Sequence, residues 1–240
     1  MRSDAVVAVL TAAGSGTRLG HELPKALVPV RGEPLVRHAA RRLLAAGVDA
    51  LVVTAPADHL GDVRAALEGL EPVVVVPGGA TRQASVAEGL AALPRGVDDH
   101  AVVLVHDAAR PFAPPELVAR VVDAVRAGHG AVVPGLPVAD TIKTVAHPDA
   151  HGAGRVVATL PRAELRAVQT PQGFDLALLR RAHAAAAATA HDESLAAGDD
   201  AGLVERLGED VWLVAGDPRA AKVTTAHDLA VAGLAGTEDA

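Results

Sequence analysis

The sequence contains no cysteine and very few aromatic residues, and each absence excludes a class of site. Without thiols the chain can form neither disulfide bonds nor thiolate-bound metal centres. Its aromatic side chains are Phe112, Phe174 and Trp212, so we do not expect the base-stacking platforms of many single-strand nucleic-acid-binding proteins. The core must therefore consist mainly of valine, leucine and alanine.

The chain also lacks an excess of positive charge and any long apolar run. Lysine and arginine total 22 against 29 acidic residues, and this formal net charge of -7 argues against a general nucleic-acid partner. No apolar run reaches the roughly 18 residues that a membrane-spanning helix needs. Met1–Asp4 lead directly into a short apolar stretch without the parts of a secretion signal. We therefore expect a cytoplasmic protein without a membrane partner.

Valine-rich runs alternate with amphipathic stretches of alanine and leucine over the first part of the chain. Continuous apolar runs are typical of strands that are covered on both faces. The pattern predicts an α/β fold with a Rossmann-like, mostly parallel sheet flanked by helices. The expected buried strands are Val6–Leu10, Ala50–Thr54, Val73–Val76, Ala101–Val105 and Ala131–Pro134, and the expected helices are Leu35–Ala46, His59–Leu70, Ala80–Leu93 and Pro115–Ala127.

The pattern changes after Pro137, where more polar segments begin. A polar turn between two β-segments indicates an arm over about residues 137–163 that leaves the main sheet. Composition nowhere shifts toward a linker, so we expect a single domain over residues 1–240 that carries this arm. The expected elements are β-segments at Asp140–Val145, Arg155–Leu160 and Val211–Ala215, and helices at Asp175–Thr189 and Thr225–Gly233.

A loop of small residues follows the first predicted strand, at the sheet edge where open α/β folds bind ligands. The dinucleotide-binding pattern G-x-G-x-x-G does not fit, because the third glycine comes one residue late and Pro24 follows. The Walker pattern fails because no Gly-Lys-Ser/Thr is present at its end. Small residues let backbone N–H groups approach phosphate, and Arg18 and Lys25 can neutralise charge on a transferring phosphorus. The spacing alone leaves open a surface loop with solvated cations.

Five blocks of sequence carry a more specific signal when they are taken together. The first three blocks are Ala12–Lys25, Gly78–Arg82 together with Ser85, and Val105–Pro111. The fourth block combines Asp140–Lys143, Arg162 and Gln169–Phe174, and the fifth is Lys222–Thr225. In this order they resemble the nucleotidylyltransferases, and among these the 2-C-methyl-D-erythritol 4-phosphate cytidylyltransferase family of the non-mevalonate isoprenoid pathway. The resemblance extends from Val6 to about Ala232, and it depends on all five blocks because each one alone is weak.

The resemblance implies transfer of CMP from CTP to 2-C-methyl-D-erythritol 4-phosphate, with Mg²⁺ or another divalent cation, in a homodimer formed through the arm. It also implies a role for each matching residue. The catalytic residues around the α-phosphate would be Arg18, Lys25 and Lys222. The nucleotide would be bound by the backbone of Ala12, Ala13, Gly14 and Gly16, and its cytidine pocket would be lined by Gly79, Ser85 and Ala108. The sugar phosphate would face Asp107, which is also a candidate metal ligand, and Arg110, and the acceptor at the partner subunit would be reached by Thr141 and Arg162.

Three alternatives remain open on the sequence. A ribitol 5-phosphate cytidylyltransferase would share the fold and the reaction. An enzyme for another nucleotide would share the first loop, although the four later blocks argue against it. A non-catalytic nucleotide-binding protein is compatible with the fold, but it would need no cations on the acceptor side.

Outside the site, we expect His106 to be structural and Asp199 and Asp200 to begin a helix.

Overall fold

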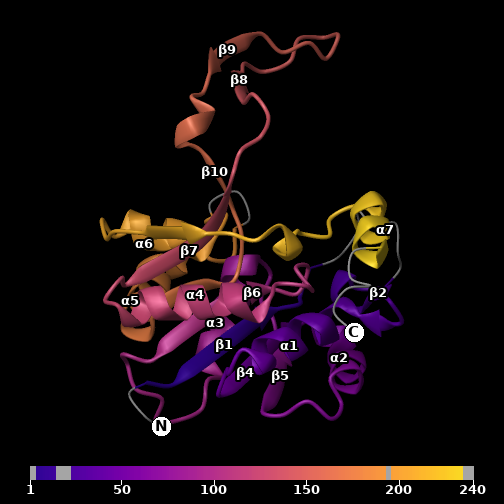
Figure 1. The fold of residues 1–240 in the computed structure, drawn as a ribbon, viewed down its shortest axis with the longest axis vertical. Helices are drawn as coiled ribbons and strands as arrows, with labels where there is room; N and C mark the ends of the chain where they lie inside the picture. The colour runs from indigo at the N-terminus through magenta and orange to yellow at the C-terminus, as the bar shows by residue number, and fades with distance from the viewer. Residues whose placement is uncertain (1–3, 15–22, 193–195, 235–240) are drawn as a thin grey trace.

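The computed structural model describes residues 4–14, 23–192 and 196–234. Figure 1 shows a central sheet with helices on both faces and an arm that projects from it. Among the described residues, eight strands form the sheet in the order β10-β7-β11-β6-β1-β4-β5, with β12 beside β7. The strands are β1 (Val6–Thr11), β4 (Ala50–Ala55), β5 (Val73–Pro77), β6 (Val102–Asp107), β7 (Ala131–Pro137), β10 (Arg166–Val168), β11 (Gln172–Asp175) and β12 (Trp212–Ala215).

Strand β1 lies at the centre of the sheet, and its position explains its composition. It pairs in parallel with β4 on one side and with β6 on the other. Successive side chains point to opposite faces, so Ala8 and Leu10 enter one buried cluster while Val7 and Val9 enter the other. Because both faces are covered, the strand is apolar from Val6 to Leu10, without the alternation of a half-exposed strand.

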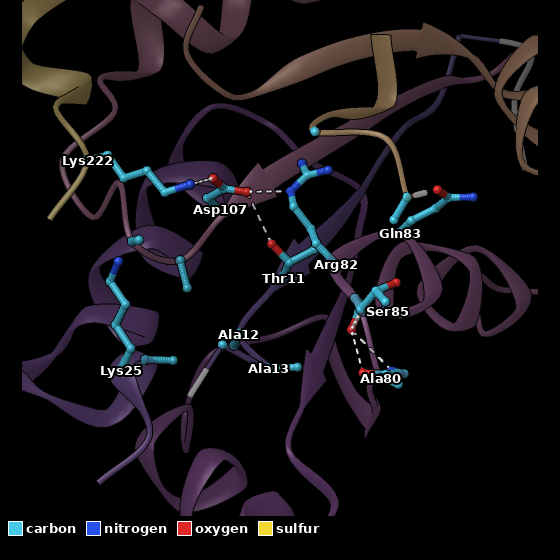
Figure 2. Close-up of a pocket in the computed structure, with 18 of the residues that line it drawn as sticks. Thr11, Ala12, Ala13, Lys25, Ala80, Arg82, Gln83, Ser85, Asp107 and Lys222 are labelled. Carbon is cyan, nitrogen blue, oxygen red and sulfur yellow. Dashed lines mark hydrogen bonds and ion pairs between the residues drawn. The ribbon is translucent and has the colours of Figure 1, made fainter. Parts of the chain in front are cut away.

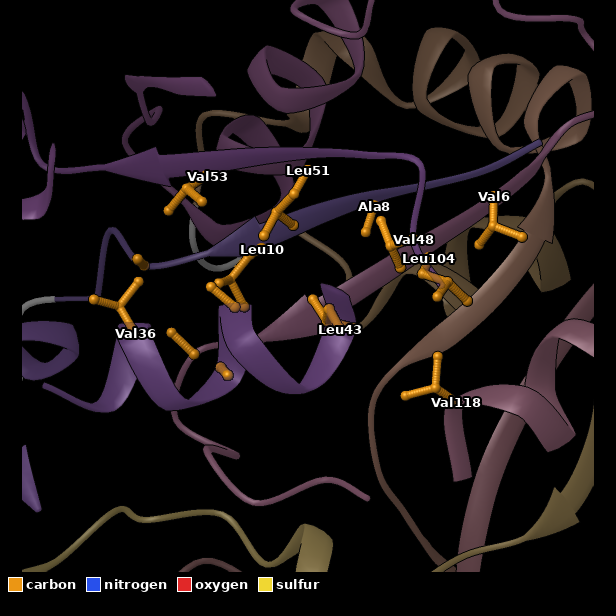
Figure 3. Close-up of a cluster of buried hydrophobic side chains, with 14 of the residues drawn as sticks. Val6, Ala8, Leu10, Val36, Leu43, Val48, Leu51, Val53, Leu104 and Val118 are labelled. Carbon is orange, nitrogen blue, oxygen red and sulfur yellow. The ribbon is translucent and has the colours of Figure 1, made fainter. Parts of the chain in front are cut away.

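Helices cover both faces of the sheet. Figure 3 shows one cluster, in which Val36 and Leu43 of α1 and Val118 of α4 pack over Leu10 and Leu104 of the sheet. Helices α1, α2 and α4 contribute to this cluster, and α3, α5 and α6 contribute to the cluster on the opposite face. The helices are α1 (Leu35–Ala45), α2 (Leu60–Ala66), α3 (Arg82–Ala91), α4 (Pro115–Arg126), α5 (Leu176–Ala185), α6 (Asp200–Arg206) and α7 (Ala226–Leu234).

The predicted α/β sheet flanked by helices is confirmed, with two differences in detail. The sheet is mixed, because β10 and β11 run antiparallel to their neighbours, and the sequence pattern predicts neither of these short strands. The expectation that Val73–Val76 is buried is wrong. That segment is the edge strand β5, so one side lacks a neighbouring strand and Val74 is 51% exposed.

The two predicted β-segments of the arm are confirmed as an antiparallel hairpin of β8 (Lys143–Val145) and β9 (Val156–Thr159). All residues of both strands are exposed, and Figure 1 shows the hairpin at the far end of the arm. A second small hairpin, β2 (Pro29–Val30) with β3 (Glu33–Pro34), lies beside helix α7.

The expected helix start at Asp199 and Asp200 is also confirmed. Asp199 precedes α6, and its Oδ1 accepts a hydrogen bond from the Gly202 N–H at 2.9 Å. Within the described ranges, no helix combines the length and the apolar character that crossing a membrane requires.

Candidate active site

A pocket of about 710 Å³ opens at the carboxyl ends of β1 and β6. This is the edge at which open α/β sheets bind ligands. Figure 2 shows side chains from β1, α3 and β6 meeting there with Lys25 and Lys222. The predicted site residues that line the pocket are Ala12, Ala13, Gly14, Lys25, Gly79, Ser85, Asp107, Ala108 and Lys222. Arg18 and Gly16 lie outside the described residues.

The turn before α3 forms a wall that tolerates no additional side chain. A Cβ atom on Gly79 would lie 2.4 Å from the Cβ of Ala84, and one on Gly78 would lie 2.7 Å from the Cβ of Ala13. Ser85 fixes this turn, because its Oγ accepts from the Gly79 N–H at 3.1 Å and donates to the Thr81 carbonyl at 2.8 Å. Backbone groups can therefore approach a ligand closely along this wall.

The Asp107 carboxylate is the buried charged centre of the pocket. Its Oδ1 accepts from Arg82 Nε at 3.1 Å and from Thr11 Oγ1 at 3.3 Å, and its Oδ2 accepts from Lys222 Nζ at 2.7 Å (Figure 2). Burial by itself raises the pKa of Asp107, but the charges of Arg82 and Lys222 outweigh it and hold the pKa far below its ordinary value. The carboxylate is therefore ionised at neutral pH.

Arg82 is a site residue to which the sequence analysis assigned no role. Its Nη1 donates to Asp200 Oδ2 at 2.7 Å, so one guanidinium joins two carboxylates. Asp200 in turn accepts from His183 Nε2 at 2.9 Å through its other oxygen. The sequence offers one signal, because a cation in the first turn of a helix opposes the helix dipole, which sets Arg82 apart from an ordinary surface arginine.

Lys25 and Lys222 come from distant parts of the chain and reach the same end of the pocket. Lys25 begins the short 3-10 helix Lys25–Leu27, directly after Pro24. Lys222 lies between the 3-10 helix Pro218–Ala220 and α7. Figure 2 shows both ammonium groups on the side of the pocket that Asp107 occupies. Lys222 pairs with Asp107 and Lys25 lies on the same side of the pocket, so two cations can face one polyanionic ligand.

Three predicted substrate-binding residues do not line the pocket of this chain. The Arg110 guanidinium donates to the Ala220 carbonyl at 2.7 Å and to the Val168 carbonyl at 3.2 Å. Thr141 and Arg162 belong to the arm, where Arg162 Nη1 donates to the Ala139 carbonyl at 2.7 Å.

The comparison with known proteins agrees with this geometry. The family model described as 2-C-methyl-D-erythritol 4-phosphate cytidylyltransferase (IspD) matches residues 6–236. The chain belongs to this family. Two enzymes of that name, from Nocardia farcinica and Saccharopolyspora erythraea, are each 54% identical to it. The matches cover 95% of this chain and 92% and 97% of the two relatives.

Solved structures of the cytidylyltransferase family share the fold. The crystal structure of the Thermus thermophilus enzyme is 40% identical, with a TM-score of 0.71, and the match covers 95% of this chain and 97% of that one. The 4-diphosphocytidyl-2C-methyl-D-erythritol synthase structure from Anaerococcus prevotii is 28% identical, with a TM-score of 0.79 over 97% and 98% of the two chains. The family resemblance inferred from the five sequence blocks is confirmed.

Among the described residues that line the pocket, Asp107 supplies the only carboxylate. Within the described residues, no group of three or more His, Cys, Asp or Glu side chains could hold a metal. One carboxylate is compatible with Mg²⁺, which often binds through one or two carboxylates and the substrate phosphates. Lys222 already contacts Oδ2, so a cation at that oxygen would share it with the lysine ammonium group.

His106 has the structural environment that the sequence analysis expected. It is fully buried, its Nε2 lies 3.1 Å from the Arg110 carbonyl, and its Nδ1 lies 2.9 Å from Thr170 Oγ1. These partners suit the neutral ring, in which Nε2–H donates to the carbonyl and Nδ1 accepts from the hydroxyl. Burial lowers the pKa of His106 to about 4.

The depressed pKa of His106 predicts a loss of stability in mild acid. The unfolded chain takes up this proton near pH 6.5 and the folded chain only near pH 4, so stability is complete above the unfolded pKa and falls as the pH drops. Between pH 7.5 and pH 5, His106 should remove about 2 kcal/mol from the free energy of unfolding. Urea unfolding of wild type and His106→Gln at both pH values tests this, and equal pH slopes would contradict it.

Proposed function

We propose that this chain transfers CMP from CTP to 2-C-methyl-D-erythritol 4-phosphate, giving 4-diphosphocytidyl-2-C-methyl-D-erythritol and pyrophosphate. The observation that carries the proposal is the meeting of Lys25, Lys222 and Asp107 in one pocket with a wall of small residues. Membership of the cytidylyltransferase family supports the same reaction.

The wall of the pocket suits the nucleotide. Gly79, Ser85 and Ala108 leave space for a pyrimidine and offer backbone groups for its hydrogen bonds. The backbone of Ala12, Ala13 and Gly14, continued by Gly16, binds the triphosphate. A larger base would have to displace the tightly packed turn before α3.

The reaction is an in-line displacement at the α-phosphorus of CTP. An oxygen of the acceptor phosphate forms the new P–O bond, and the bond to the β-phosphate breaks as pyrophosphate leaves. A phosphate monoester has a second pKa of about 6, so the attacking oxygen is already ionised and no general base is needed. The main obstacle is repulsion between two polyanions, which Lys25 and Lys222 reduce together with Arg18.

Asp107 orients the cationic side of this centre. It binds Lys222 and Arg82 at the same time, so both cations are already near the place where charge develops. When bound, Mg²⁺ neutralises charge on the triphosphate, and Asp107 would hold it together with the substrate phosphates.

The proposal extends to the organisation of the chain. Residues 1–240 form a single nucleotidylyltransferase domain, and the arm over about residues 137–163 joins two copies into a homodimer. Exposed valines on the arm hairpin support this, and the most exposed of them is Val145 at 61%. In the dimer, Thr141 and Arg162 contact the acceptor at the pocket of the other copy, and Arg110, which lies outside the pocket lining of its own copy, faces the bound acceptor.

Arg162→Ala is expected to weaken binding of the acceptor. Loss of one hydrogen bond to a charged phosphate costs about 1.5–3 kcal/mol, which corresponds to a rise of about 10- to 150-fold in the KM for the acceptor. The KM for CTP should stay within about twofold. Steady-state kinetics with each substrate varied in turn measures both values, and a rise in the CTP value alone would contradict this placement of the arm.

The reaction is tested by pyrophosphate release from CTP, Mg²⁺ and 2-C-methyl-D-erythritol 4-phosphate. Ribitol 5-phosphate and the other nucleoside triphosphates are tested in parallel. Release that needs both CTP and the methylerythritol substrate supports the proposal. Release with ribitol 5-phosphate instead would keep the mechanism and change the acceptor. Binding of CTP without release in any combination would indicate a non-catalytic nucleotide-binding protein.

A further inference from the structure

The segment that carries Lys222 is fixed on its N-terminal side by Gln169, which is buried and does not line the pocket. Gln169 Nε2 donates to the Asp217 carbonyl at 2.9 Å, and its Oε1 accepts from the Asp217 N–H at 2.9 Å. A Cβ atom on Gly216 would lie 2.5 Å from this Oε1. The side-chain amide of Gln169 therefore fixes the backbone at Asp217, because it binds both the N–H and the carbonyl of that residue.

Asp228 fixes the same segment on its C-terminal side. Its Oδ2 accepts from the Thr224 N–H at 2.8 Å, from Thr224 Oγ1 at 2.6 Å and from the Thr225 N–H at 2.8 Å. The Asp228 N–H returns a bond to Thr225 Oγ1 at 3.2 Å. This reciprocal arrangement is a capping box at the start of α7. The bonds from Thr224 hold the pKa of Asp228 below its ordinary value, so the cap is present throughout the neutral range.

Between these two anchors, Val223 attaches the chain to the wall of the pocket. Its N–H donates to the Ala109 carbonyl at 2.8 Å, and its side chain is buried with Val28, Val30 and Leu35. Val28 directly follows the 3-10 helix that begins with Lys25. The backbone beside Lys222 therefore packs on the same cluster as the backbone that leads from Lys25.

The Lys222 side chain forms the 2.7 Å ion pair with Asp107 and is 42% exposed. Asp107 orients the ammonium group, but a lysine stem is flexible, so its placement also depends on where the backbone at Lys222 is held. Stabilisation of a transition state depends on such placement, and a shift of about 1 Å can reduce a rate by about 10²-fold.

We propose that Gln169 and Asp228 are positioning residues for Lys222, acting through the backbone of residues 217–225 without contacting substrate. The inference rests on the proposed catalytic role of Lys222. Asp228→Ala and Gln169→Ala are each expected to lower kcat by about tenfold, while the KM for CTP stays within about twofold.

The decisive measurement is a double-mutant cycle with Lys222→Ala. If the two residues act through Lys222, either alanine substitution lowers kcat in the wild-type background and lowers it no further once Lys222 is absent. A general loss of structure would instead reduce kcat by the same factor in both backgrounds. Asp228→Glu retains a carboxylate at the capping position and should recover most of the activity.

Asp175→Ala is the matched control. Asp175 caps α5 by accepting from the Leu178 N–H at 3.0 Å, and it does not line the active-site pocket. This variant should lose a similar amount of thermal stability and keep the wild-type kcat. Gln169→Met is a second variant, because it keeps a side chain of similar length in the buried site and removes only the two hydrogen bonds to Asp217.

The two hypotheses fail differently. Wild-type turnover in Lys222→Ala would remove the proposed role of Lys222. An impaired Lys222→Ala together with normal kcat in Asp228→Ala and Gln169→Ala would overturn the positioning role alone. Equal fold losses with and without Lys222, from variants whose melting shows a folded protein, would overturn it as well.

Discussion

Lys25→Ala is expected to lower kcat for CMP transfer by at least about 10²-fold, the scale of losing one electrostatic stabiliser of a transition state. Lys25 begins its 3-10 helix at the end of the pocket where Asp107 and Lys222 meet (Figure 2). Negative charge concentrates at the α-phosphorus as the second phosphate approaches, so one cation should matter more for the rate than for CTP binding.

Single-turnover and steady-state rates with saturating CTP measure this effect. Lys25→Arg retains the charge with a different geometry and should be intermediate between alanine and wild type. Arg180→Ala is the control for removal of one positive charge, because Arg180 pairs on the surface with Asp99. Near-normal turnover in Lys25→Ala would remove this lysine from the mechanism.

The second large effect concerns stability. Asp200→Ala should lower the free energy of unfolding by about 3–5 kcal/mol, because it leaves the half-buried Arg82 guanidinium without one of its two carboxylates and the buried His183 ring without its partner. Asp200 is only 1% exposed and binds Arg82 at 2.7 Å and His183 at 2.9 Å. Turnover should fall too, since Arg82 also binds Asp107.

Urea unfolding at neutral pH measures this loss. Asp99→Ala is the matched control, because the Asp99–Arg180 pair has a similar 2.7 Å separation but lies exposed on the surface. Its removal should cost less than about 1 kcal/mol. Similar losses in the two variants would show that the Asp200 pair contributes no more than an ordinary surface ion pair.

The sequence could predict those parts of the site that depend on local pattern. Strands β1 and β6 pair in parallel, with Thr11 opposite Asp107, so two residues at predicted strand ends had to meet at one edge. The small-residue loop and the Gly78–Gly79 turn also follow from local composition. The approach of Lys25 and Lys222, in contrast, came from family resemblance, because neither lysine belongs to a periodic element.

The remaining features depend on long-range pairing, which periodicity does not encode. Arg82 and Asp200 are 118 positions apart, and Gln169 meets a backbone amide 48 positions away. Strands β10 and β11 are short segments placed by their antiparallel partners, and their sequences carry no strong strand pattern of their own.

The ion pair between Asp107 and Lys222 also has a consequence for biosynthesis. The two residues are 115 positions apart. At about 5–20 residues per second, the ribosome adds Lys222 about 6–23 seconds after Asp107. Strands β1, β4 and β6 can pair during this interval, while the carboxylate at their edge still lacks its lysine. A nascent chain can therefore form part of its central sheet before it contains both members of the Asp107–Lys222 pair.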